Sequence, residues 1–397
     1  MSFAQLQVNQ KQWRLAGQRL IEMAIAEFLY EEIIQVTDLK DNRYQLTLDD
    51  QTYTFKAQNY LLGHWQIEEG SVRELSVVED LPAWNLHTFI RAFSNQTEVK
   101  PFTKAYLIKE MNNTWLAEAH LFDERRLSSE AALTASHYEI EGMLRGHPWL
   151  IMSKGRMGFG YDDYLSAAPE LSPTVKVLWL AVHRDLAEFR STEEWQAGTL
   201  YQYELDAEEL DSFEQQLHER GCSCRDYFLI PVHAWQWHQW LVPTYANEIV
   251  DQRIIELGVG QDDHVPMQSI RTLCNISQPE RHYVKLPVSI FNTAVYRGLP
   301  SKRNLAAPAV TAWLKQIQSQ DSDLKQSGVA FLGEVATLTI HQPCFDQIEG
   351  APYQFKELFG CLWRESVDPV IGTGEQALSQ AALLHRDING QSILAVL

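Results

Sequence analysis

Residues 146–159 place an imidazole and two cationic side chains in one short segment. These side chains are His147, Lys154 and Arg156, and the segment is interrupted by Gly146, Pro148, Gly155 and Gly158. Glycine lets a backbone approach a ligand closely, while lysine offers a point charge and arginine a planar fork that suits phosphate or carboxylate. The pattern indicates an anion site, although a solvated basic loop has the same composition.

A second cationic group lies far downstream, and it strengthens the interpretation. Ser269, Arg271 and Thr272 combine hydroxyl groups with a fork donor of the kind that binds phosphate. In an expected extended segment over 285–297, Lys285, Thr293 and Arg297 are separated by 8 and 4 positions, and even separations put side chains on one face of a strand. Surface salt bridges are the alternative, and Pro287 is a place where the strand register can break.

The segment after residue 232 concentrates aromatic residues where a helix is expected to begin. Trp237 and Trp240 have the spacing of core or interface packing. His233 stands directly at the predicted junction between strand and helix, where an imidazole can also contact a ligand. Both interpretations remain open for this histidine.

The surrounding pattern predicts an α+β fold, with a helical N-terminal region that contains a β-hairpin, followed by a mixed, strand-richer α/β region. Helices are expected at 11–35, 84–94, 129–145, 206–219 and 304–318. The hairpin is expected at 44–48 and 52–56, and further strands at 175–182, 227–232 and 283–295. Turn-forming residues near 160–175 predict a boundary between domains at 1–165 and 166–397.

The charge balance limits the classes of partner. The 397 residues carry 33 Lys and Arg against 52 Asp and Glu, a formal net charge of −19. This charge opposes binding to nucleic acid or to an anionic membrane, and an anionic ligand needs local cations to reverse the field. No leader, long apolar run or zinc-ligand spacing is present, so we expect a cytoplasmic protein with reduced thiols and no structural metal.

These residues, in this order, resemble the IucA/IucC family of NRPS-independent siderophore synthetases. The resemblance covers most of the chain from about residue 130 onward. It is carried by His147-Pro148, Lys154, Arg156, Gly158-Phe159, Ala168-Pro169-Glu170, Pro231-Val232-His233, Trp235-Gln236, Ser269-Ile270-Arg271-Thr272, Lys285-Leu286-Pro287, Thr293, Arg297 and Leu362-Trp363-Arg364-Glu365.

The resemblance implies an ATP-dependent carboxylate–amine ligase. Such an enzyme adenylates a carboxylate of citrate, or of a citrate-derived intermediate, and passes the acyl group to a polyamine, amino-acid or hydroxamate nucleophile. By motif matching, ATP contacts fall on Ser269, Arg271, Thr272, Lys285, Lys154, Arg156 and His147. Citrate contacts fall on Thr293, Arg297 and His233, with Lys285 and Arg297 acting in catalysis and Mg²⁺ accompanying ATP.

Some features differ from the family pattern. Leu150-Ile151 stands where a second His-Pro is usual, and Ala234 follows His233 in place of proline. The family continues into a C-terminal palm domain, whereas this chain ends at Leu397, so the resemblance implies thumb and fingers regions only. Two hypotheses follow, a synthetase represented by these regions or a noncatalytic homologue that binds a citrate-like ligand or a partner protein. Family members often pair, which allows a homodimer.

Overall fold

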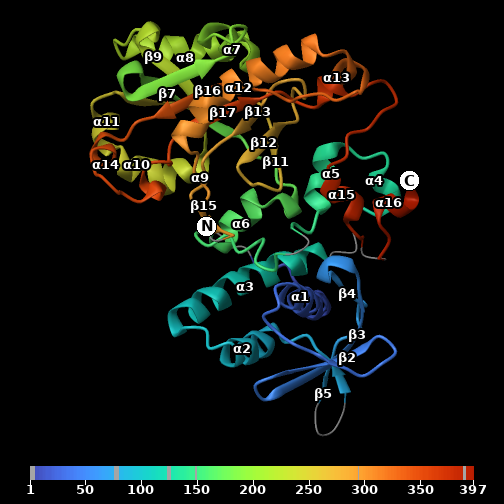
Figure 1. The fold of residues 1–397 in the computed structure, drawn as a ribbon. Helices are drawn as coiled ribbons and strands as arrows, with labels where there is room; N and C mark the ends of the chain where they lie inside the picture. The colour runs from blue at the N-terminus through green and yellow to red at the C-terminus, as the bar shows by residue number, and fades with distance from the viewer. Residues whose placement is uncertain (1–4, 76–79, 123–126, 148–149, 294, 388–389) are drawn as a thin grey trace.

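The structure is a computed structural model with two main hydrophobic cores. It describes residues 5–75, 80–122, 127–147, 150–293, 295–387 and 390–397. One core draws its residues from 16–151 and the other from 175–363. Figure 1 shows the first around α1 to α3 in blue and the second around the green and orange strands, so the α+β class is confirmed.

Three helices build the N-terminal core, namely α1 (Gln10–Tyr30), α2 (Leu86–Gln96) and α3 (Pro101–Leu121). The Asn9 side chain accepts from the Gln12 backbone N–H and fixes where α1 begins. Trp115 of α3 stacks on Trp13 of α1 with ring centroids 4.2 Å apart. Gly17 lies so close to the Trp84 carbonyl oxygen that any β-carbon there would collide with it. Tight helix packing therefore needs glycine at this position.

The predicted hairpin is confirmed, and it belongs to a larger antiparallel sheet. The strands are β1 (Thr37–Asp38), β2 (Arg43–Leu48), β3 (Gln51–Asn59), β4 (Trp65–Ile67), β5 (Arg73–Leu75) and β6 (Asp80–Pro82). Their order is β1-β2-β3-β5-β6, and β4 also pairs with β3. Leu46 and Leu48 of β2, with Tyr53 and Phe55 of β3, alternate with more exposed residues and face the core.

Short helices connect the two cores. They are α4 (Ser129–Ala132), α5 (His137–Met143), α6 (Tyr161–Ala167) and η2 (Pro169–Leu171). The predicted continuous helix over 129–145 is wrong because Ser136 caps a new helix, with Glu139 completing the capping box. The C-terminal α15 (Gln380–Leu384) and α16 (Ile393–Val396) lie beside α4 and α5 in Figure 1. Asp387 accepts from the Ser129 backbone N–H at 2.9 Å.

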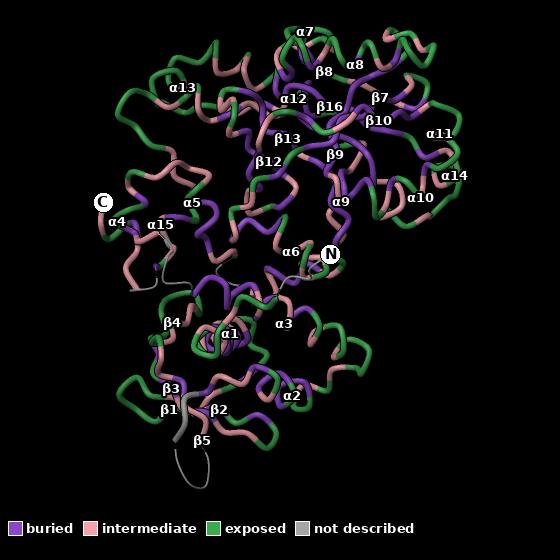
Figure 2. The backbone as a smooth tube through the Cα atoms, turned by 180° about the vertical axis from the view of Figure 1, so that it is seen from behind, coloured by how far each residue is buried: buried purple, intermediate pink, exposed green. Residues whose placement is uncertain are grey.

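Two sheets form the second core. The smaller has the order β10-β7-β9, from β7 (Val177–His183), β9 (Tyr227–His233) and β10 (Ile254–Val259). The larger has the order β11-β12-β13-β17-β16-β8. Its strands are β8 (Ala187–Ser191), β11 (His264–Pro266), β12 (Thr272–Asn275), β13 (Tyr283–Lys285), β16 (Glu334–Ile340) and β17 (Gly360–Arg364). Figure 2 shows these central strands as largely buried.

Helices and a small hairpin surround these sheets. The helices are α7 (Ala197–Glu204), α8 (Ala207–Glu219), α9 (Ala234–Gln236), η5 (Trp237–Leu241), α10 (Val242–Thr244), α11 (Ala246–Val250), α12 (Ser301–Gln320), α13 (Ser322–Gln326) and α14 (Pro343–Asp346). The hairpin is β14 (Phe291–Asn292) with β15 (Val295–Tyr296). Both helices predicted in this half are confirmed, as α8 and α12. No helix in the described part of the chain is long and apolar enough to cross a membrane.

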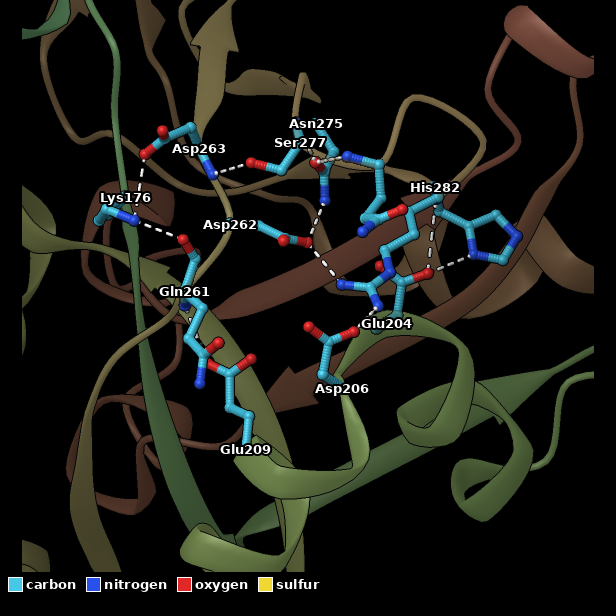
Figure 3. A network of polar contacts seen from close by, with 12 residues as sticks. Lys176, Glu204, Asp206, Glu209, Gln261, Asp262, Asp263, Asn275, Ser277 and His282 are labelled. Atoms are coloured by element: carbon cyan, nitrogen blue, oxygen red, sulfur yellow. Dashed lines mark hydrogen bonds and ion pairs between the residues drawn. The ribbon is translucent and has the colours of Figure 1, made fainter.

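A polar network fastens the loops at one end of these sheets (Figure 3). Arg281 donates to Asp206 at 2.7 Å and to Asp262 at 2.6 Å, and Asn275 donates to the same Asp262 carboxylate at 2.6 Å. The His282 ring contacts Glu204 at 2.7 Å. Each permanent cation of this network, Arg281 and Lys176, contacts a carboxylate within it, which is the arrangement of a structural anchor.

Candidate functional site

Cationic side chains gather on one face of the larger sheet. Thr272 of β12 pairs with Lys285 of β13, and Tyr283 of β13 pairs with Arg364 of β17. Directly paired residues share a face of an antiparallel sheet, and residues two apart on one strand share it too. Lys285 and Arg364 therefore lie on the same face, next to the buried Thr272.

A strained turn brings Arg271 to this face. Ile270 has φ of 60°, a left-handed conformation that is unfavourable for a β-branched residue, yet its side chain is buried. The Ser269 hydroxyl accepts from the Thr272 backbone N–H at 3.1 Å and donates to Thr272 Oγ1 at 2.9 Å. The turn holds the hydroxyl groups of Ser269 and Thr272 together, while the Arg271 guanidinium donates to the Gly298 carbonyl.

Thr293 and Arg297 come together by a route that the sequence did not predict. The predicted strand over 283–295 is wrong, because β13 ends at Lys285 and Thr293 lies in a turn with φ of 52°. The Arg297 guanidinium donates to Thr293 Oγ1 across the β14–β15 hairpin. Lys285, Thr293 and Arg297 therefore do not share the face of one strand, and a tight turn joins the last two.

Arg271, Lys285, Arg297 and Arg364 form what we call the cationic cluster. Burial lowers the pKa of Arg271, and together with the neighbouring Arg297 it brings that pKa to about 10. Burial also lowers the pKa of Lys285, and the positive charges of Arg271 and Arg364 add to that effect against the opposing Glu334. A positive charge that lowers the pKa of another cation must lie near it, so Arg297 lies near Arg271, and Arg271 lies near Lys285.

Two arginines of the cationic cluster have a hydrogen-bond donor without an acceptor. The Nε atoms of Arg271 and Arg364 are buried and have no hydrogen-bond partner. Among the residues that the structure describes, none of the four cations forms an ion pair with a carboxylate. A buried guanidinium nitrogen without an acceptor is costly, so the cluster favours an anionic ligand that accepts from both arginines.

The cations of the first predicted segment are arranged differently. Lys154 Nζ lies 3.1 Å from a Glu118 carboxylate oxygen, and Arg156 holds Glu170 with two bonds of 2.5 and 2.8 Å. Lys154 and Arg156 are only 2% and 4% exposed, so an incoming phosphate would have to displace a buried carboxylate. Pro148 lies outside the described residues, and Lys154 and Arg156 each already hold a carboxylate. Their contact with nucleotide stays a prediction.

The same segment holds the hairpin that carries Thr293. The Asn292 side chain accepts from the Arg156 backbone N–H at 3.1 Å and donates to the Ser153 carbonyl at 3.1 Å. Met157 and Phe291 exchange two backbone hydrogen bonds of 2.8 Å. The buried ion pairs thus fix a loop, and the loop fixes the hairpin. Sequence reasoning missed Asn292, whose only signal was its place beside Thr293.

A model of the IucA / IucC family matches residues 136–385. The chain belongs to the IucA / IucC family.

Curated relatives match this sequence over nearly the whole chain. The rhizobactin siderophore biosynthesis protein RhbF of Rhizobium meliloti is 38% identical over 98% of this chain and 65% of its own length. Putrebactin synthase of Shewanella is 33% identical over 97% and 62%, and aerobactin synthase of Escherichia coli is 29% identical over 97% and 66%. The chain therefore spans somewhat less than two thirds of the length of these relatives.

Solved structures show the same fold. Aerobactin synthetase IucC of Klebsiella pneumoniae superposes with a TM-score of 0.86 at 28% identity, covering 98% of this chain and 68% of that one. The petrobactin biosynthesis protein AsbB of Bacillus anthracis gives a TM-score of 0.84 at 26% identity, covering 98% of this chain and 64% of that one.

Two histidines singled out in this IucA / IucC chain lie apart from one another. His147 is exposed and lines cavities of about 480 and 210 Å³, neither of which is lined by a member of the cationic cluster. His233 is buried, which lowers its pKa to about 4, and it accepts from the Trp235 backbone N–H at 3.2 Å. His233 therefore caps α9 as a neutral imidazole, and its contact with substrate stays a prediction.

Magnesium has no ready protein site in the part of the chain that the structure describes. No group of three or more His, Cys, Asp or Glu side chains there is arranged to hold a metal ion.

Proposed function

We propose that this chain supplies phosphate- and carboxylate-binding groups of an ATP-dependent siderophore synthetase, which joins a carboxylate of citrate or a citrate derivative to an amine or hydroxyl. The observation that carries the proposal is the cationic cluster, in which the buried Nε atoms of Arg271 and Arg364 have no acceptor. The protein around it has a net charge of −19. Such a concentration of unpaired cations has a clear use if polyanions bind there.

The residues divide into two groups by position. Ser269, Arg271, Thr272 and Lys285 lie together at the ends of β12 and β13, and we assign them to the phosphates of ATP. Thr293 and Arg297 lie together on the β14–β15 hairpin, and we assign them to a carboxylate of citrate. Arg297 is close enough to Arg271 to lower its pKa, so the two ligands would meet between these arginines.

The chemistry agrees with this placement. A carboxylate oxygen attacks the α-phosphorus of ATP, pyrophosphate leaves, and the nucleophile then displaces AMP from the acyl carbon. Two anions must approach each other in the first step, so the positive charges of Lys285, Arg271 and Arg297 stabilise the transition state. Mg²⁺ bound to the phosphates would supply further screening of the leaving pyrophosphate.

The names of relatives support an amine as the second substrate. One relative is a citryl-spermidine ligase of Bacillus anthracis, 34% identical over 65% of this chain and 41% of its own length. Its name specifies citrate joined to a polyamine.

Calorimetric titration of this chain with MgATP and with citrate, separately and together, tests the binding proposal. We expect each to bind, and Arg271→Ala to weaken MgATP. Arg190→Ala is the matched control because Arg190 lies on β8, at the edge strand of the same sheet, and pairs with Glu188. Absence of binding by either ligand would refute the proposal. Binding without citrate-dependent pyrophosphate exchange would favour the noncatalytic homologue.

A further inference from the structure

An aromatic pocket of about 420 Å³ adjoins the β14–β15 hairpin. Five aromatic residues line it, namely Tyr106, Trp235, Trp240, Phe291 and Tyr296. They come from α3, from α9 and η5, and from the hairpin, so segments far apart in the sequence build one cavity. We call this cavity the aromatic pocket.

Among the residues that the structure describes, those lining the aromatic pocket include no charged side chain. Its polar members are Gln239 and Ser289, and the rest are the five aromatic residues, Met157 and Gly158. Aromatic faces carry partial negative charge and attract a cation at close range, with tryptophan the strongest. The pocket therefore suits an alkylammonium group and repels phosphate and carboxylate.

The pocket and the proposed carboxylate site share one hairpin. Phe291 and Tyr296 are a cross-strand pair that contributes to the aromatic pocket. The turn between them contains Thr293, and Arg297 follows Tyr296 directly. One hairpin therefore carries both part of the pocket lining and the residues that we assign to citrate.

We propose that the aromatic pocket binds the protonated end of a diamine or polyamine co-substrate. The inference rests on the proposed function. It identifies the site that binds the ammonium group at the end of the nucleophile that does not react. An ammonium group is repelled by the cationic cluster, where Arg271, Lys285, Arg297 and Arg364 accumulate. The adjacent uncharged pocket is a place where that charge is tolerated while the other end of the molecule reaches the acyl group.

The reaction at the other end balances without further reagents. The neutral amine nitrogen attacks the acyl carbon of the citryl adenylate and forms a C–N bond. The bond between that carbon and the phosphate oxygen breaks, and AMP leaves with the electron pair. The nitrogen then loses its extra proton to water. The ammonium group in the aromatic pocket takes no part in the bond changes, so its role is binding and orientation.

The test measures binding of 1,5-diaminopentane to this chain by calorimetry, with Trp240→Leu and Tyr296→Leu as the variants. We expect each variant to weaken binding about two- to fivefold, the size of one cation–π contact at a partly exposed site. Tyr296→Phe keeps an aromatic ring and should bind nearly as the parent does. Trp313→Leu is the matched control, because Trp313 is a 59% exposed tryptophan on α12 that does not line the pocket.

The salt dependence of diamine binding and competition by other ligands distinguish the proposed site from its alternatives. Binding to rings, without a carboxylate partner, should change little between about 0.05 and 0.5 M NaCl, whereas an ion pair on the surface would weaken. Displacement of the diamine by adenosine would overturn the proposal in favour of a nucleobase pocket. Lack of diamine binding, or equal binding by the leucine variants, would also overturn it. If diamine binds as expected while MgATP and citrate do not, the proposed function fails and the pocket remains an ammonium site.

Discussion

Replacing Glu170 with alanine should destabilise the protein strongly, because it leaves a buried guanidinium without its counter-charge. Glu170 and Arg156 are 2% and 4% exposed and are joined by two hydrogen bonds. Removing one partner of a buried ion pair costs about 3–5 kcal/mol. We expect the free energy of unfolding, measured by urea denaturation, to fall by about that amount. Glu188→Ala is the control, since its pair with Arg190 is largely exposed and worth at most about 1 kcal/mol.

The pH dependence of stability provides an independent check on the same ion pair. Although burial alone would raise it, the Arg156 guanidinium lowers the pKa of Glu170 to about 2 in the folded protein, from 4.5 for an unperturbed side chain. A lowered folded pKa gives stability that is present above pH 4.5 and is lost as the pH falls toward 2. The alanine variant should lose this part of the acid dependence.

Glu170→Ala also distinguishes a structural role of Arg156 from a role in phosphate binding. If Arg156 is structural, the variant loses stability, and the hairpin amides of residues 291–293 exchange hydrogen faster because the loop that grips Asn292 is released. If Arg156 binds phosphate instead, freeing it from Glu170 should tighten MgATP binding with little loss of stability. An unchanged free energy of unfolding would show that the buried pair is not the anchor that its geometry suggests.

The remaining predictions concern the site itself. Lys285→Ala should weaken MgATP binding by about 1.5–3 kcal/mol, the worth of one charge-assisted hydrogen bond, and unaltered affinity in calorimetry would remove Lys285 from the phosphate site. Arg297→Ala should abolish citrate binding and citrate-dependent ATP consumption with near-normal circular dichroism, so retained turnover would exclude its proposed role. Asn292→Ala should weaken citrate more than MgATP, whereas Asn275→Ala, which breaks the network of Figure 3, should lower the melting temperature and leave citrate affinity unchanged. Equal effects of the two asparagine variants on citrate would mean that Asn292 has a general structural role only.

Local sequence patterns were enough to predict elements whose residues pack in a regular period. The hairpin of β2 and β3 alternates buried and exposed residues, and α8 and α12 follow helical periodicity, so each was predicted within a few residues. Helix α3 was missed, although Pro101 at its first turn is a typical start signal. The predicted continuous helix over 129–145 was wrong because Ser136 caps a new helix in the middle of that range.

The residues of the candidate site were predicted better than their arrangement in space. Arg271, Lys285 and Arg297 were expected to converge, and they do, but the argument from even spacing was mistaken. Convergence depends on the left-handed turns at Ile270 and Thr293, and β-branched residues give no sequence signal for such turns. Arg364 belongs to the cluster because β17 pairs with β13, and this long-range pairing could not be predicted from local sequence.

The difference between the two basic segments could not be decided by residue type, since both contain lysine and arginine beside glycine or hydroxyl residues. It is decided by where the acids lie. Glu118 on α3 and Glu170 in η2 reach Lys154 and Arg156, whereas no carboxylate in the described part of the chain forms an ion pair with Arg271 or Arg364, although Glu334 lies opposite Arg364 in the strand register. In a protein of net charge −19, acids are abundant enough to neutralise most cations. A group of half-buried cations that stays without a carboxylate partner under those conditions is therefore stronger support for an anionic ligand than the basic motif that first suggested one.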